Sequence, residues 1–254
     1  MIKVRYLSEG KIEQDAELLL AEYEETAGAP IKLPVPVADI TTYHLALQLG
    51  FADLHQTLNV PMVRNQPDIL GAIWVHKEII LIDRSLDPEE NPSSLGRYRF
   101  SVAHEIGHWR LHRCYVAKDT NQTSLFDEPP EPTVICRSSQ AKEPIEWQAD
   151  FFSSCLLMPR RRVHDEWKDC LGRTRPLLVS DLRPNGQVMM RAQTLIYGQG
   201  RNEADAVEDA LFENVAKPIA RRFGVSPAAM RIRLEKLGLL LRQAPRQTSL
   251  TVGP

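Results

Sequence analysis

The chain has 254 residues, of which 43 % are apolar and 25 % are charged, a composition typical of a globular protein with a sizeable core. Its formal net charge of −2 argues against a protein that binds nucleic acid through its overall charge. We find no secretory segment at the N-terminus and no apolar run long enough to span a bilayer, so we expect a cytoplasmic protein without membrane contact.

The first part of the chain is predicted to contain two helices followed by a pair of strands. Residues 11–25 have the spacing of an amphipathic helix, and a second helix is expected near residues 40–49. Residues 73–75 and 78–83 have the composition of strands joined by a tight turn. With a free edge, such a strand could bind a substrate backbone by β-augmentation, whereas a hairpin inside the core would have no such role. The sequence leaves both interpretations open.

The strongest motif is HExxH, within the stretch FSVAHEIGHWRLHR at residues 100–113. Apolar residues recur through it at intervals of three and four, which predicts a largely buried helix. His104 and His108 then lie one turn, about 6 Å, apart on the same face. Two neutral imidazoles at this spacing can bind one zinc ion, and Glu105 beside them can take a proton from water that the zinc activates. The pattern predicts one Zn²⁺ per chain, with Glu105 as the catalytic base.

A catalytic zinc usually has three protein ligands, so the motif needs one more. His112 is near in sequence, but on a continuous helix it lies about 12 Å along the axis from His104, too far to share one ion. We therefore expect His112 either at the helix surface or in contact with a ligand residue.

A better third ligand is predicted in a second apolar helix, which we expect between Pro144 and Pro159. Glu146 and Asp150 lie one turn apart on it, and buried carboxylates need a compensating partner. Glu146 would complete a site of two histidines and one glutamate, and Asp150 would accept the second N–H of a ligand histidine. The fallback ligands are Glu143, Glu131, Glu128 and Asp127.

The stretches RFSVAHEIGHWRLH and EWQADFFSSCLLMP together resemble the ImmA/IrrE family of zinc metallopeptidases from bacteria and phages. The chain differs from the family pattern in having serines and a cysteine at residues 153–155, where small residues such as alanine are usual. The resemblance implies an α+β, zincin-like fold with helices around a small sheet. It also implies that His104, His108 and Glu146 bind zinc, that Glu105 is the base, and that the substrate is a helix-turn-helix transcriptional repressor, cleaved in mobile-element induction or stress responses.

The predicted organisation is a zinc metallopeptidase domain, a C-terminal helical region that resembles a helix-turn-helix, and a flexible tail, at residues 1–205, 206–242 and 243–254. Within the first domain we place N-terminal helices, the strand and HExxH core, and the third-ligand helix, at residues 10–60, 70–115 and 144–158. Residues 118–142 are polar and proline-rich, which is typical of a loop. The fold of residues 160–205 stays open, as does the choice of an oxyanion-stabilising residue among His164, Tyr115 and Arg175.

The C-terminal region supports an alternative function. Ser226 is a typical N-cap, with Pro227 opening the second of two helices. From Lys217 to Arg246 there are eight basic residues and one acidic residue, a net charge of +7. The alternative is a DNA-binding regulator that reads bases through Arg231 and Arg233. Basic helical pairs are also common in proteins that do not bind DNA, so direct DNA binding is the less favoured interpretation. The protein partner that the resemblance implies, a transcriptional repressor, is favoured.

Overall fold

The computed structural model describes residues 4–61, 69–119, 132, 134–137 and 143–244. The chain forms two compact units: residues 1–159 with 222–225, and residues 160–221 with 226–254. The sequence suggested a boundary at residue 205, whereas the compact units divide at Pro159. The reason is that residues 186–199 form a helix that packs on the C-terminal helices. Whether the peptidase region ends at residue 205 stays a prediction. Residues 245–254 of the expected tail lie outside the described residues.

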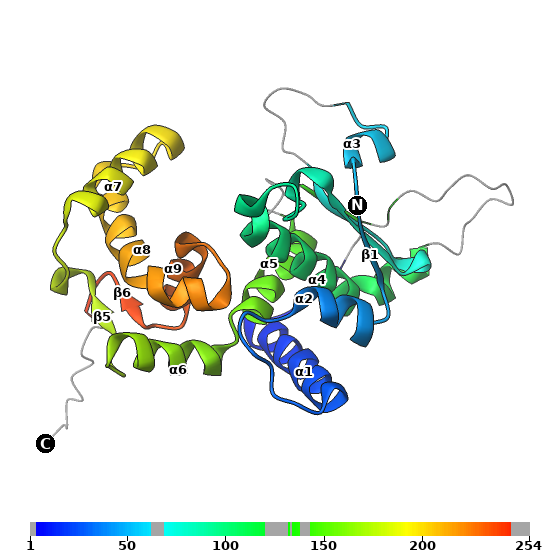
Figure 1. Ribbon diagram of the computed structural model, residues 1–254, viewed down its shortest axis with the longest axis horizontal. Helices are drawn as coiled ribbons and strands as arrows, with labels where there is room; N and C mark the ends of the chain where they lie inside the picture. Colours follow the sequence, from blue (N-terminus) through cyan, green and yellow to red (C-terminus); the bar gives the residue numbers. More distant parts are fainter. Residues whose placement is uncertain (1–3, 62–68, 120–131, 133, 138–142, 245–254) are drawn as a thin grey trace, which may run out of the picture. The chain divides into compact units, whose positions relative to one another are not determined.

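The first unit is built on a four-stranded sheet with the strand order β1-β3-β2-β4 (Figure 1). The strands are β1 (Gln48–Ala52), β2 (Ile69–Trp74), β3 (Ile79–Asp83) and β4 (Val134–Arg137). β2 and β3 form the predicted hairpin and pair antiparallel, with Glu78 in the left-handed region at the turn. β1 runs parallel to β3, and β4 runs antiparallel to β2. Helices on a small mixed sheet confirm the predicted α+β class.

Two sequence expectations in this unit need correction. The helix expected near residues 40–49 is shorter: α2 (Val37–Asp39) continues as one wide turn at Ile40–His44, and Ala46 then takes a positive φ of 55°, which ends the helical path. Gln48 and Leu49 belong to β1 instead, because they pair with β3. The expected loop at residues 118–142 also contains a strand, since its apolar residues at 134–135 pair with β2.

Three long helices complete the first unit: α1 (Glu9–Ala27), α4 (Leu95–Asp119) and α5 (Pro144–Leu157). α4 contacts the sheet, and α5 packs against both α4 and α1. Gly107 allows the two central helices to approach closely, because a Cβ at that position would lie 3.1 Å from Ala149 Cα. Arg110 joins α4 to α1 through ion pairs with Asp15 and Glu22. The motif helix is therefore held on several sides. Shorter segments are α3 (Leu54–Thr57) and 3-10 turns at Val75–Lys77, Arg84–Leu86 and Pro92–Ser94.

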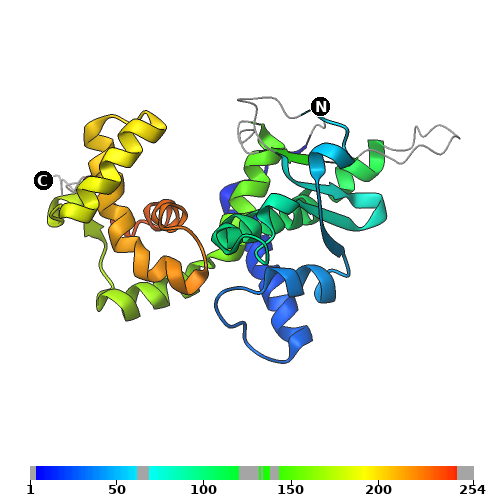
Figure 2. The same cartoon turned by 45° about the horizontal axis from the view of Figure 1, so that its top comes forward.

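The second unit is mainly helical, as expected for the C-terminal region. Its helices are α6 (Arg160–Leu171), α7 (Gly186–Gln199), α8 (Glu203–Phe223) and α9 (Pro227–Lys236), with a 3-10 turn at Val179–Asp181. β5 (Leu177–Leu178) and β6 (Leu240–Leu241) form a two-stranded parallel ladder. α7 and α8, yellow to orange in Figure 2, share a small apolar core. The Ser226 side chain accepts a hydrogen bond from Ala229 N–H at 3.1 Å, which confirms the N-cap of α9.

None of the helices in the described part of the chain combines the length and the apolar character that crossing a bilayer requires.

Candidate metal centre

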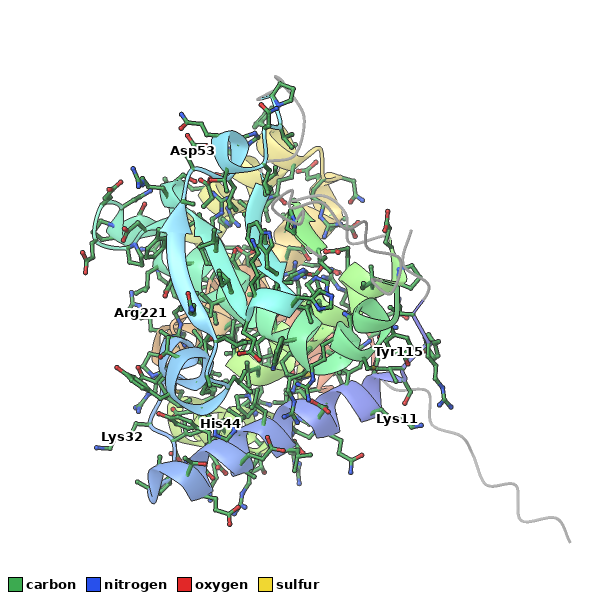
Figure 3. The ribbon with its side chains drawn as sticks, turned by 90° about the vertical axis from the view of Figure 1, so that its right-hand side faces the viewer. Lys11, Lys32, His44, Asp53, Tyr115 and Arg221 are labelled. Carbon is green, nitrogen blue, oxygen red and sulfur yellow. The ribbon has the colours of Figure 1, made fainter. Side chains whose placement is uncertain are left out.

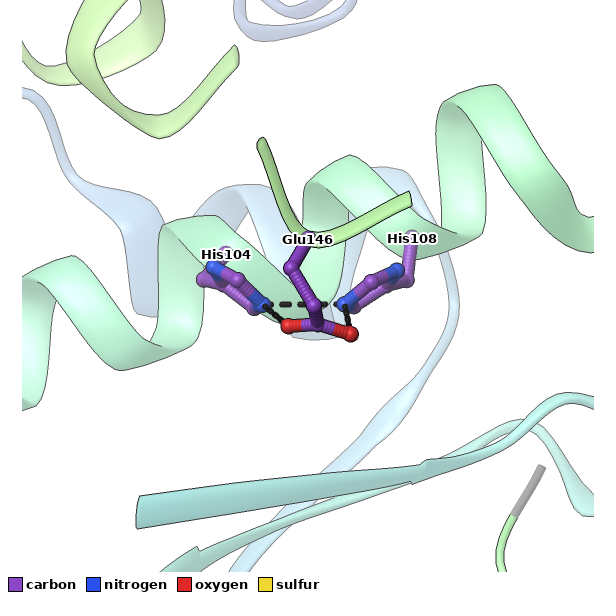
Figure 4. Close-up of side chains that lie close together, drawn as sticks. All are labelled: His104, His108 and Glu146. Carbon is purple, nitrogen blue, oxygen red and sulfur yellow. Dashed lines mark hydrogen bonds and ion pairs between the residues drawn. The ribbon is translucent and has the colours of Figure 1, made fainter. Parts of the chain in front are cut away.

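Two histidines of α4 and one glutamate of α5 converge in the first unit (Figure 4). His104 Nε2 lies 2.9 Å from His108 Nε2 and 3.1 Å from Glu146 Oε2. His108 Nε2 lies 3.6 Å from Glu146 Oε1. The helical repeat sets the two imidazoles side by side, and the packing of α5 on α4 brings the carboxylate to them. All three side chains are buried.

The arrangement fits a tetrahedral metal ion. Ligand atoms about 2.0–2.1 Å from a tetrahedral zinc lie about 3.3 Å from one another, close to the separations found here. Burial raises the pKa of Glu146, but its close contacts with the His104 and His108 rings outweigh this and lower the pKa to about 2. Burial lowers the pKa of His108. The carboxylate is thus charged and the imidazole neutral at neutral pH, which are the protonation states that bind a metal.

Glu105 lies beside this cluster and is fully buried. Neither of its carboxylate oxygens accepts a hydrogen bond from the described residues. Burial raises the pKa of Glu105 to about 8, with a smaller opposing effect from His104. A buried carboxyl group is costly without a partner, and a cation or water in the neighbouring cluster would supply one. The donor set and the unpartnered carboxylate together fit a hydrolytic metal site.

Comparison with known proteins agrees with this chemistry. Residues 65–171 match the Peptidase_M78 family, described as the IrrE N-terminal-like domain. Over this stretch the chain is similar to the Peptidase_M78 family. No curated protein matches the chain. Among solved structures, a Mycobacterium tuberculosis transcriptional regulator is 15 % identical, with a TM-score of 0.41 over 95 % of this chain and 49 % of the other. The chain therefore spans about half the length of that structure.

The stretch that matches the family contains His104, Glu105, His108 and Glu146, and Asp150 as well. Asp150 Oδ1 lies 2.9 Å from His104 Nδ1, on the opposite side of the ring from the cluster. A carboxylate can only accept there, so His104 carries its proton on Nδ1 and presents the lone pair of Nε2 to the cluster. The contact predicted for Asp150 is present, and its role in holding a ligand stays a prediction.

His112 is buried and does not belong to the cluster. Its Nδ1 lies 3.0 Å from His108 Nδ1, so of the two expectations for this residue the structure favours contact with a ligand residue. Its Nε2 lies 3.3 Å from Gln148 Oε1. Gln148 was missed by the sequence analysis. The only signal was a polar residue in an apolar helix, between Glu146 and Asp150.

The other residues proposed for the metal site are less well supported. Glu143 is described but lies outside the cluster, and the remaining fallback ligands at residues 127, 128 and 131 lie outside the described residues. Tyr115 lies in the last turns of α4 (Figure 3), whereas His164 and Arg175 belong to the second unit. The choice of an oxyanion-stabilising residue among these three stays open.

Two functional interpretations of the sequence are contradicted. The hairpin of β2 and β3 has no free edge for a substrate, because β4 pairs with β2 and β1 pairs with β3. Arg231 and Arg233 of α9 are not free to read bases, because they are only 8 % and 2 % exposed. Arg231 forms ion pairs with Asp209 and Glu235. Helical spacing predicts α9 but not which of its faces is buried.

Proposed function

We propose that the protein is a zinc-dependent endopeptidase that cleaves a helix-turn-helix transcriptional repressor and so relieves repression. The convergence of His104, His108 and Glu146 beside the unpartnered carboxylate of Glu105 carries the proposal. The match of residues 65–171 to the Peptidase_M78 family supports the peptidase activity. The substrate class rests on the resemblance to ImmA/IrrE proteins alone, and a repressor would be met in the cytoplasm.

Under this proposal His104, His108 and Glu146 hold one zinc ion per chain. Zinc, when bound, supplies a Lewis acid that polarises the scissile carbonyl and lowers the pKa of the attacking water. Glu105 accepts the proton of that water on its carboxylate and passes it to the leaving amine. Burial raises the pKa of Glu105 above that of a free glutamate, which favours uptake of a proton from the attacking water. Asp150 holds the His104 ring in its metal-binding tautomer.

Incubation of the full chain with the repressor encoded beside its gene tests the proposal. The protein is first stripped with a chelator and then reloaded with zinc, and fragments are identified by mass spectrometry. Discrete fragments from zinc-loaded wild type, and none from stripped protein or Glu105→Gln, are the expected result. If the enzyme cleaves unfolded proteins but leaves the repressor intact, the substrate assignment is overturned. A zinc-loaded protein that cleaves nothing would overturn the peptidase itself.

A further inference from the structure

The side of the His108 ring that faces away from the cluster leads into a chain of buried polar groups. His108 Nδ1 meets His112 Nδ1 at 3.0 Å, and His112 Nε2 meets Gln148 Oε1 at 3.3 Å. Gln148 Nε2 then donates to the backbone carbonyl of Arg5 at 3.0 Å. His108, His112 and Gln148 are each 1 % exposed or less. This series of hydrogen bonds joins α4, α5 and the segment that precedes α1.

Only one assignment of donors and acceptors satisfies every group in this series of hydrogen bonds. The Arg5 carbonyl can only accept, so the amide nitrogen of Gln148 must face it and the amide oxygen must face His112. That oxygen also only accepts, which places the proton of neutral His112 on Nε2 and leaves a lone pair on Nδ1. His108 must then donate from Nδ1, and its Nε2 lone pair points into the cluster. A backbone carbonyl three hydrogen bonds away therefore selects the tautomer that can bind a metal.

The N-terminal segment that supplies this carbonyl is fixed by a second contact. Tyr6 stacks on Trp147 of α5, with ring centroids 6.2 Å apart and planes inclined by 6°. Trp147 is the neighbour of both Glu146 and Gln148 in sequence. Tyr6 is 71 % exposed overall, so this stack is a packing contact of a largely exposed side chain. The stack holds the Arg5 carbonyl where Gln148 reaches it.

We propose that His112 and Gln148 are positioning residues for the metal ligand His108, and that the N-terminal segment at Arg5 and Tyr6 forms the outer end of this support. The proposal rests on the proposed zinc site but not on the identity of its substrate. Its role differs from that of Asp150, which supports His104 with a charged carboxylate and whose side chain is 35 % exposed. His108 is supported instead by a neutral, buried chain of groups.

Zinc affinity, measured by competition with a chromophoric chelator, tests the proposal without any peptidase assay. His112→Phe keeps the ring volume but cannot accept from His108, and loss of such an outer partner typically weakens binding by about 10- to 100-fold. His112→Asn is smaller but keeps an acceptor oxygen near the position of Nδ1, so it should recover most of the affinity. A packing role alone predicts the reverse order, because asparagine leaves a cavity where phenylalanine does not.

Three further variants complete the experiment. His55→Phe in α3 is the matched control and should bind zinc like wild type. Gln148→Met removes the next link without changing its volume greatly, and truncation to a chain that begins at Leu7 removes the Arg5 carbonyl. Both should weaken zinc binding, the truncation less than His112→Phe, because each step lies farther from the metal. Thermal unfolding of the metal-free proteins confirms that each is folded.

Wild-type zinc affinity in both His112→Phe and Gln148→Met would overturn the proposal, and so would an Asn variant that binds more weakly than the Phe variant. If wild type itself binds no zinc, the proposed function fails and not the hydrogen-bond chain alone. If wild type binds zinc and cleaves nothing, the order of affinities among the variants still decides the positioning role.

Discussion

Gly71 of β2 lies directly against the proposed base. A Cβ built on Gly71 would lie 2.6 Å from Glu105 Oε1 and 3.2 Å from its Cδ, whereas ordinary contact begins near 3.4 Å. Gly71 has no positive φ, so its backbone conformation suits alanine. The substitution Gly71→Ala therefore tests one contact, that between a strand and the carboxylate of Glu105.

The expected effect follows from the overlap. Glu105 Oε1 and the new methyl group must separate by about 0.8 Å to reach 3.4 Å, and the fully buried carboxylate has no solvent to move into. Overpacking of this kind costs about 1–3 kcal/mol of stability. Misplacement of a catalytic group by about 1 Å can cost a hundredfold in rate, so we expect kcat to fall by about 10- to 100-fold. Zinc stoichiometry should not change, because the atoms nearest to this methyl group belong to Glu105 and not to the three ligands.

A double-mutant cycle separates the carboxylate contact from a general effect on the strand. In a Glu105→Ala background the space is empty, and Gly71→Ala should be neutral or stabilising by about 0.4–1 kcal/mol, since alanine restricts the unfolded chain. The coupling free energy between the two positions should then be about 1–3 kcal/mol, within the range for residues in contact. Gly50→Ala in β1 is the strand control, with its Cβ 3.3 Å from a flexible Leu81 methyl group. An equal cost of Gly71→Ala in both backgrounds, by denaturant unfolding of the metal-free proteins, would refute the reasoning.

Four other predictions concern the third ligand, the base, its pKa and the second unit. Glu146→Ala should lose bound zinc together with activity, and full metal content by elemental analysis would show that another residue is the third ligand. Glu105→Gln should keep zinc but lose turnover by about a hundredfold or more. In metal-free wild type the pKa of Glu105, about 8 against 4.5, means that only the folded state keeps this proton between those values. Below pH 6.5 the lowered pKa values of His108 and His112 have the opposite effect on stability, so a fall of about 1.4 kcal/mol per pH unit should appear as the pH rises from about 6.5 to 8. Unfolding measured across this range should show no such slope in the glutamine variant. Arg231→Ala should destabilise by about 1–3 kcal/mol, because Asp209, only 1 % exposed, loses one ion-pair partner but keeps Arg201 and Arg242. No measurable change in denaturant unfolding would contradict a buried ion-pair network.

The centre of the candidate site could be predicted from sequence because it depends on one helical repeat and one composition anomaly. The spacing of His104 and His108 fixes their distance on any continuous helix. Glu146 and Asp150 stood out because carboxylates are rare in apolar helices. The structure brings all four side chains together, as expected. Their roles as ligands and as a tautomer-fixing partner stay predictions until metal binding is measured.

Residues whose importance depends on contacts between elements could not be predicted. Gly71 is one of thirteen glycines in the sequence. Only the packing of β2 against α4 shows that it faces Glu105. Gln148 matters because α5 packs beside His112, which no periodicity reveals. The burial of Arg231 and Arg233 escaped for the same reason: a basic segment of net charge +7 is read as solvent-exposed unless its acidic partners on another helix, such as Asp209, are known.

The packing of α5 on α4 links all of these groups. Within one stretch of five residues, 146–150, α5 supplies a partner to each of the three histidines of α4: Glu146 and Asp150 to His104, Glu146 to His108, and Gln148 to His112. The two helices also approach closely at Gly107 and Ala149, and Ala149 lies within that same stretch. Because a helix is rigid on this scale, the distance between the helices there sets the ligand geometry and the supporting hydrogen bonds together. The glycine inside HEIGH is therefore as much a part of the site as the histidines that flank it, since any larger residue would move every partner at once.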